Sequence, residues 1–312
     1  MSDFVIVGER RSGTTSLYHW LKRHPDIYLL EKPDHNFFIE EEIVLGREWR
    51  EGRADAEAWE RGHSPQDYQA LFADSAEGAI SGHKGADLLF WQEAHPRIKR
   101  YLPEGKFIVV LRNPIDRAWS HYWNEIGKGR ETMGFEDAIE KEPERIKVSD
   151  YARDHLSYLS RGFYAKSLAR WFETLDRDRT LVLILEKIRK DPDAAMRKVY
   201  TFLGVDPEKA APIKGAKHNA NWTTEPRFPD LPKPIKKLES LWMRLSAGVV
   251  RRLTGNPDKR RKWRNRANWI FRKPVAGRPV PSAVRKRLRA IYAPANQKLA
   301  EMLQIDLKEW HS

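Results

Sequence analysis

Short apolar runs alternate along the chain with longer stretches in which apolar residues recur every three or four positions. Buried strands are predicted where the runs are rich in β-branched residues, at 5–7, 106–111 and 180–185, and shorter extended segments at 27–30 and 79–84. Helical periodicity indicates helices at the end of segment 3–24 and within 40–78, 90–101, 150–176 and 191–203. This alternation predicts an α/β fold, with an open parallel β-sheet flanked by helices on both faces.

Proline and glycine mark several of the expected helix ends. Pro114 follows the strand at 106–111, and proline is well suited to the first turn of a helix. Asp191 and Pro192 open a later helix in the same way, and Gly204 ends it. Each boundary places a loop directly after a predicted strand.

The loop after the first strand has the pattern G-x-x-x-x-G-T-T over residues 8–15. A strand, a glycine-containing loop and a helix in that order form a phosphate cradle. The spacing is that of a Walker A loop, but Thr14 stands where the lysine of an ATP-hydrolysing loop belongs, and the cations Arg10 and Arg11 lie inside the loop. The pattern therefore favours phosphate binding without ATP hydrolysis.

This loop resembles the 5′-phosphosulfate loop of sulfotransferases that use 3′-phosphoadenosine 5′-phosphosulfate (PAPS). Their pattern is roughly G-x-x-K-x-G-T-T/S, and Arg11 occupies the usual lysine position. The resemblance implies that the donor is bound by Arg10, Arg11, Ser12, Gly13, Thr14, Thr15 and Ser16. Arginine keeps the positive charge but cannot release a proton, so an acid role for Arg11 is not expected.

A second motif, R-N-P-x-x-R-x-x-S-x-Y over residues 112–122, follows the strand at 106–111. It lies at the carboxyl edge of the predicted sheet, where open α/β folds bind their ligands. It resembles the 3′-phosphate motif of the same family, which implies that Arg112 and Ser120 hold the 3′-phosphate of PAPS. A phosphate needs a fork of donors and a hydroxyl near a helix N-terminus, which agrees with this assignment.

Candidate catalytic groups lie in two further segments. Asp34, three residues before Phe37, matches the position of the proposed base in glycan sulfotransferases, and His35 is a rival base. Lys84 matches a family lysine near the transferred sulfate, and His83, which replaces the usual glutamate, is another candidate base. Arg11 is expected to act with Lys84 on the sulfate.

Weaker matches extend the resemblance over residues 4–220 and 281–310. The segment 161–171 resembles the family's R-G-x-Y-x-x-x-L-x-x-W helix, which places Tyr164 near the donor. The loop Lys214, Gly215, Ala216 and Lys217 resembles a loop that closes over the donor's phosphates. The apolar residues of 288–310 resemble the family's closing helix.

The composition excludes cysteine chemistry and gives expectations for location, metal content and domain number. The 312 residues carry a net charge of +13 and include no cysteine, so disulfides and thiolate chemistry are excluded. No apolar run reaches 18 residues and the first strand begins by residue 4, so a cytoplasmic protein without a signal peptide is expected. No metal-ligand spacing is present, and no metal is expected. A single domain over 1–312 is predicted.

Much of the positive charge lies in residues 233–273, where Trp242, Trp263 and Trp269 are interleaved with lysines and arginines. Apolar residues at helical spacing predict an amphipathic, basic helical excursion near the C-terminus, an insertion or lid within 233–275. A lid over an anionic or sugar acceptor, contact with an anionic membrane surface, and a solvated helix all fit this segment. Nucleic-acid binding fits the charge, but no nucleic-acid motif accompanies it.

The resemblance therefore implies transfer of a sulfuryl group from PAPS, leaving adenosine 3′,5′-bisphosphate (PAP), to a hydroxyl or amine. The acceptor, whether a glycan, a lipid or a small metabolite, stays open. One alternative is a kinase-like phosphotransferase. Such an enzyme needs an acidic magnesium ligand after a strand, and Glu186, after the strand at 180–185, is the one candidate. The other is a basic protein that binds nucleic acid or membrane through 233–273.

Overall fold

The computed structural model describes residues 2–31, 37–39, 65–213, 224–226, 272–274 and 279–311. The chain separates into two compact units, one of residues 1–121, 133–218 and 280–312, the other of residues 122–132 and 219–279. The single domain over 1–312 stays a prediction.

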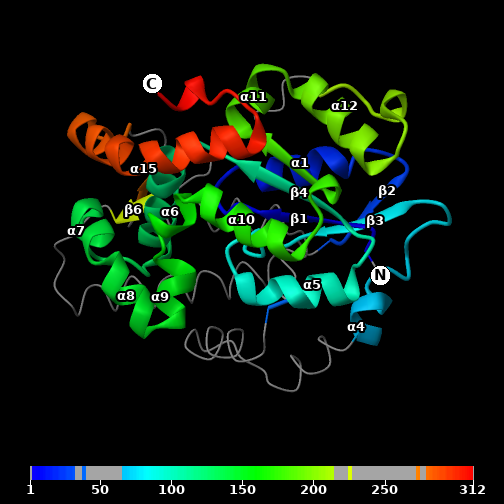
Figure 1. Ribbon diagram of the computed structural model, residues 1–312. Helices are drawn as coiled ribbons and strands as arrows, with labels where there is room; N and C mark the ends of the chain where they lie inside the picture. The colour runs from blue at the N-terminus through cyan, green and yellow to red at the C-terminus, as the bar shows by residue number, and fades with distance from the viewer. Residues whose placement is uncertain are drawn as a thin grey trace. The chain divides into compact units, whose positions relative to one another are not determined.

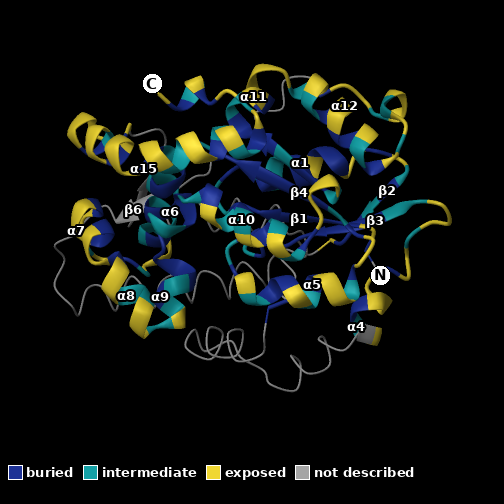
Figure 2. Ribbon diagram, in the orientation of Figure 1, coloured by how far each residue is buried: buried dark blue, intermediate teal, exposed yellow. Residues whose placement is uncertain are grey.

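A parallel sheet forms the centre of the first unit (Figure 1). Its described strands lie in the order β2-β3-β1-β4-β5, and all pair in parallel. Their bounds are β1 Phe4–Gly8, β2 Ile27–Leu29, β3 Ile80–Lys84, β4 Lys106–Leu111 and β5 Thr180–Ile184. The central strands β1 and β4 are buried nearly throughout, as their continuous apolar runs predict (Figure 2).

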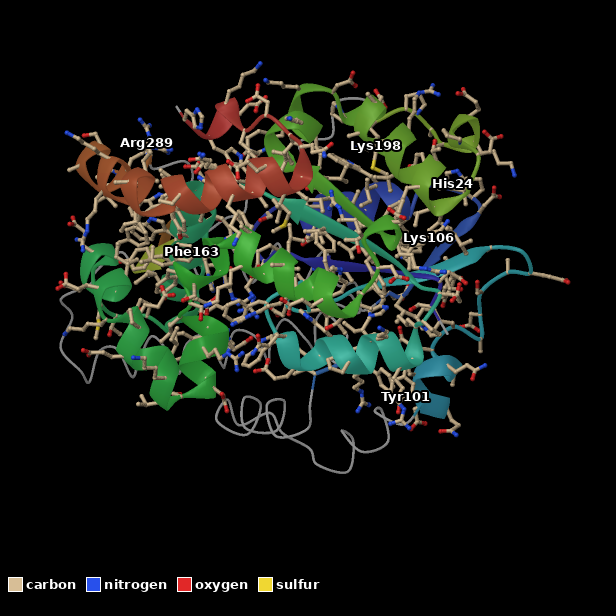
Figure 3. The ribbon with its side chains drawn as sticks, in the orientation of Figure 1. His24, Tyr101, Lys106, Phe163, Lys198 and Arg289 are labelled. Atoms are coloured by element: carbon tan, nitrogen blue, oxygen red, sulfur yellow. The ribbon has the colours of Figure 1, made fainter. Side chains whose placement is uncertain are left out.

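Helices cover both faces of this sheet, which confirms the predicted architecture. One face packs on α1 (Thr14–Leu21), α11 (Leu185–Lys190) and α12 (Pro192–Leu203), which lie above the sheet in Figure 1. The other face packs on α5 (His95–Tyr101), α10 (Tyr164–Thr174) and the second half of α15 (Ser282–Leu303). His24 and Lys106, labelled in Figure 3, tie the first face to the end of α12, since Lys106 Nζ donates to the carbonyl of Leu203 at 3.1 Å and His24 Nε2 lies 2.9 Å from the carbonyl of Asp206.

The remaining described helices are short, apart from α6 (Pro114–Lys128). They are α4 Pro65–Ala70, α7 Phe135–Glu140, α8 Glu142–Val148 and α9 Asp150–His155. Single 3-10 turns are η1 Gln92–Ala94, η2 Ser160–Gly162, η3 Arg177–Arg179, η4 Pro207–Lys209 and η5 Lys308–Trp310. None of the helices in the described ranges is long and apolar enough to cross a membrane.

The predicted continuous helix over 150–176 is wrong. α9 ends at His155 and α10 begins at Tyr164, with η2 between them. Glu142 causes the break, because its carboxylate accepts the backbone N–H groups of Leu159 (2.5 Å) and Ser160 (2.8 Å). A helix would have used those groups internally.

In the second unit, β6 (Thr224–Pro226) pairs antiparallel with β7 (Arg272–Pro274). Most of the basic segment 233–273 lies between these strands in the sequence and outside the described residues. Its helical character, like most of the helix expected within 40–78, stays a prediction.

Candidate functional site

The predicted site residues follow strands that end at one edge of the sheet. Gly8 ends β1, Lys84 ends β3 and Leu111 ends β4, and these three strands are neighbours. Because parallel strands present their carboxyl ends together, the three following loops lie at one edge.

The phosphate loop, residues 8–15, turns sharply into α1. Gly13 has φ = 96°, and a Cβ atom there would lie 2.7 Å from Cδ1 of Leu185. Only glycine fits a left-handed residue packed this closely. The N–H groups of Gly13, Thr14 and Thr15 have no acceptor within the described part of the chain. They are available to an anion at the start of the helix.

Arg11, Arg112 and Ser120 meet at this edge, although about a hundred residues separate the first from the other two. Arg11 Nε donates to Ser120 Oγ at 3.2 Å, and Arg112 Nη1 donates to the Arg11 carbonyl at 3.3 Å. Arg11 itself has φ = 71°, a left-handed conformation that is strained for a residue with a side chain. The two predicted motifs are therefore in contact.

Arg112 has a hydrogen-bond donor that a bound phosphate could use. Its Nε is buried and has no hydrogen-bond partner among the described residues. Burial lowers the pKa of the guanidinium, and the nearby cation Arg189 lowers it further. Tyr164, which is fully buried, donates its hydroxyl to the Arg112 carbonyl at 2.9 Å, and burial raises the pKa of that phenol. Tyr164 thus contacts the backbone of a candidate phosphate ligand.

The start of α6 is fixed by Asn113 and Glu186. Asn113 Oδ1 accepts the Ile115 N–H at 3.0 Å, and its Nδ2 donates to the Trp310 carbonyl at 3.3 Å. Glu186 accepts the Asn113 N–H (3.1 Å) on one oxygen and Trp310 Nε1 (3.0 Å) on the other. Glu186, the candidate magnesium ligand of the kinase-like alternative, therefore has a structural role.

Lys84 and His83 face opposite sides of the sheet. Lys84 is buried and its Nζ donates to Thr15 Oγ1 at 3.5 Å, beside the phosphate loop. His83 is fully buried against Phe38 and Tyr68, with its Nδ1 3.1 Å from the Tyr68 hydroxyl. The structure brings Lys84 to the loop, whereas His83 lies in an aromatic cluster.

The side chain of Arg10 points into a group that we call the buried charge cluster: Glu9, Arg10, Asp87, Asp154 and Arg161. Arg10 Nη2 lies 2.5 Å from Asp87 and 3.1 Å from Asp154. Burial tends to raise the pKa of Asp87, but Arg10 and Arg161 outweigh it and hold that pKa below its usual value, whereas burial raises the pKa of Glu9.

Apart from Arg10, sequence reasoning missed this cluster. Its members lie up to about 150 residues apart without a common period. The available signal was the acidic residues inside short motifs, Glu9 in the loop and Asp87 three residues after Lys84.

Six predicted residues lie outside the described residues: Asp34, His35, Lys214, Gly215, Ala216 and Lys217. Their roles stay predictions. Phe37 and Phe38, which follow Asp34 in the sequence, are fully buried in the core that covers β1.

Residues 3–209, about two thirds of the chain, match the model described as the sulfotransferase family. The chain belongs to the sulfotransferase family. The chain is 27% identical over 201 residues to the Mus musculus heparan sulfate glucosamine 3-O-sulfotransferase 3A1, and the match covers 64% of this chain and 45% of that relative. The chain is also 28% identical over 298 residues to the Mus musculus heparan sulfate glucosamine 3-O-sulfotransferase 6. This match covers 96% of the chain and 70% of that relative.

The fold agrees with this family. The crystal structure of the sulfotransferase from Alicyclobacillus acidocaldarius superposes with a TM-score of 0.66 at 24% identity, over 100% of this chain and 99% of that chain. The chain spans less than half the length of the 3A1 relative. Membership in this family does not favour the kinase-like and purely binding alternatives.

Proposed function

We propose that the chain transfers a sulfuryl group from PAPS to a hydroxyl or amine of an acceptor by in-line displacement. The observation that carries the proposal is the contact of Arg11 with both Arg112 and Ser120, next to N–H groups of the phosphate loop that have no acceptor in the described part of the chain. A donor with phosphates at its 5′ and 3′ positions requires two such groups of donors, and these residues fit it.

In this proposal, the N–H groups of Gly13, Thr14 and Thr15 hold the 5′-phosphate at the start of α1, where the helix dipole favours an anion, whereas those of Ser12 and Ser16 donate to backbone carbonyls. Arg112 and Ser120 hold the 3′-phosphate, and Tyr164 supports the Arg112 backbone. Two carboxylates engage the side chain of Arg10 and its N–H donates to Glu9 Oε1 at 2.8 Å, so in this proposal Arg10 fixes the shape of the loop and does not contact the donor. Residues 214–217 close over the phosphates.

PAPS supplies the sulfuryl group when it is bound. Lys84 and Arg11 stabilise negative charge on the sulfate and the bridging oxygen. Asp34 takes the proton of the acceptor, with His35 and His83 as rival bases. The buried position of His83 supports Asp34 or His35 over it.

For the acceptor we propose a glycan, on the basis of the relatives' names, which specify heparan sulfate glucosamine. Contact of residues 233–273 with a lipid surface, and a cytoplasmic location, remain predictions. So does independence from metal ions.

Isothermal titration with PAP and ATP, each with and without Mg²⁺, tests the donor assignment. PAP is expected to bind in the presence of a chelator. Binding of ATP alone would overturn the proposal.

Transfer of labelled sulfate from PAPS tests the acceptor class. A glucosamine-containing glycan with free hydroxyls, its N-desulfated form with free amines, and a hydroxylated lipid form a matched set. Labelling of the glycans is expected. Stronger labelling of the glycan with free hydroxyls indicates O-sulfation, and stronger labelling of the form with free amines indicates N-sulfation. Labelling of the lipid alone would refute the glycan assignment.

A further inference from the structure

The buried charge cluster connects segments that carry candidate donor-binding residues. Arg161 Nη1 lies 3.0 Å from Glu9 Oε1 and 3.0 Å from Asp87 Oδ1, so one nitrogen bridges two segments. Its Nη2 donates to the Asp154 carbonyl at 3.3 Å. One guanidinium thus links the β1–α1 loop, the segment after β3 and the end of α9.

The cluster adjoins both candidate cations in sequence. Glu9 and Arg10 directly precede Arg11, and Asp87 follows Lys84 by three residues. The cluster's own charged groups face one another, and Glu9 and Arg161 are fully buried. Its two arginines therefore pair with its three carboxylates, and Asp154 also lies 3.0 Å from His155 Nδ1, while Arg11 and Lys84 lie at the edge of the sheet.

A fully buried arginine is costly unless it is well paired, and apolar residues of similar volume would often serve stability as well. Buried charges are in some proteins retained because they specify one conformation. The conformation of the phosphate loop must be held in this way, because Arg11 has a strained backbone angle, φ = 71°. A strained residue keeps such a conformation only when the surrounding structure fixes it.

We propose that Arg161 is a positioning residue that holds the phosphate loop and the Lys84 segment in their donor-binding arrangement. This inference rests on the proposed PAPS-dependent function. Arg161 acts through Glu9 and Asp87. The planar guanidinium fork is essential, because a lysine ammonium in its place would be a single point charge that cannot reach the Glu9, Asp87 and Asp154 contacts together.

Two variants and one control test the role. Arg161→Lys keeps the charge but removes the fork. Asp87→Asn removes one partner, whose side chain is 16% exposed and tolerates substitution better. Arg153→Lys is the control, because Arg153 pairs with Glu93 at 2.8 Å and packs over Trp91 without an ion pair to the loop in the described residues.

The first readout is hydrogen–deuterium exchange of peptides covering residues 5–21 in the ligand-free protein, and the second is PAP affinity by titration. Both test variants are expected to exchange faster over residues 9–16 and to bind PAP about tenfold more weakly, or worse, the scale of one lost charged interaction. The control is expected to match the wild type in both readouts.

If both test variants show the exchange and the PAP affinity of the wild type, the inference is overturned. It is also overturned if the control Arg153→Lys changes as much as the test variants do. If Arg161→Lys does not fold, Asp87→Asn decides alone. A wild type that does not bind PAP contradicts the proposed function, while the exchange measurement still decides whether Arg161 positions the loop.

Discussion

At the end of β4, Arg112 places a buried, unpartnered Nε beside the phosphate loop within the described part of the chain. Arg112→Ala should therefore weaken PAP binding roughly tenfold or more, since a hydrogen bond to a charged group contributes about 1.5–3 kcal/mol. Titration with PAP measures this. Arg197→Ala, which removes an exposed arginine on α12 paired with Glu208, serves as the control. Equal affinities for both variants would remove Arg112 from the site.

Gly13 offers a second residue-scale prediction. Gly13→Ala forces a side chain into a left-handed conformation at a cost of about 1–2 kcal/mol, and its Cβ also displaces Leu185. Gly129 is a matched control, because its φ of 72° carries similar strain while a Cβ added there would meet no described atom within 4 Å. Urea unfolding should show a loss of stability in both variants, and PAP affinity should fall only in Gly13→Ala. A PAP affinity that is unchanged in Gly13→Ala contradicts the assignment of the loop.

At the scale of elements, the interruption between α9 and α10 depends on one carboxylate. Glu142 is buried, burial raises its pKa, and it accepts hydrogen bonds from Leu159, Ser160 and the Ser160 hydroxyl. The interruption matters for the site because it directs Arg161 into the buried charge cluster and begins α10 at Tyr164.

Glu142→Gln should lower the free energy of unfolding by about 1–3 kcal/mol, because it weakens buried charged hydrogen bonds. Urea denaturation measures the change. Glu144→Gln, an exposed neighbour on the same helix, should leave the stability nearly unchanged. A similar effect of both substitutions would mean that Glu142 does not hold the interruption.

For the whole molecule, two buried histidines set a pH dependence. Burial lowers the pKa of His95 and, together with Arg117, holds the pKa of His121 well below 6.5. As the pH falls through about 6.5, the unfolded chain binds protons that the folded chain does not, so the free energy of unfolding decreases.

The contribution of these two histidines to the free energy of unfolding should therefore fall between about pH 8 and pH 5, while the buried Glu9 and Glu142, whose pKa values burial raises, contribute in the opposite direction. Urea unfolding at several pH values measures the slope. In His121→Gln, which removes one of the two imidazoles, the slope should be smaller than in the wild type. An equal slope in the wild type and in His121→Gln would show that this imidazole does not contribute to the pH dependence.

Local patterns were enough to predict the sheet, because strands such as β1, β4 and β5 are continuous apolar runs with a clear stop, whereas the polar β3 was expected only as a short extended segment. The family resemblance assigned Arg11, Arg112 and Ser120 to one donor site, which agrees with loops after neighbouring parallel strands sharing an edge, but it did not predict the direct contacts of Arg11 with the other two. Local patterns could not predict the break at Glu142 or the pairing of Arg161, because these depend on side chains that are distant in sequence. Asp34, His35 and residues 214–217 lie outside the described residues, so their placement stays predicted.

The hydrogen bond from Asn113 to Trp310 joins residues 197 positions apart. A ribosome makes the chain from its N-terminus, so the phosphate loop and the residues around Arg112 emerge long before the tryptophan that completes the clasp around Glu186. During synthesis the nascent chain can form its central strands early, yet the full set of contacts at the start of α6 requires residue 310. Donor-binding competence is therefore expected to arise late in translation, only after this segment has left the exit tunnel.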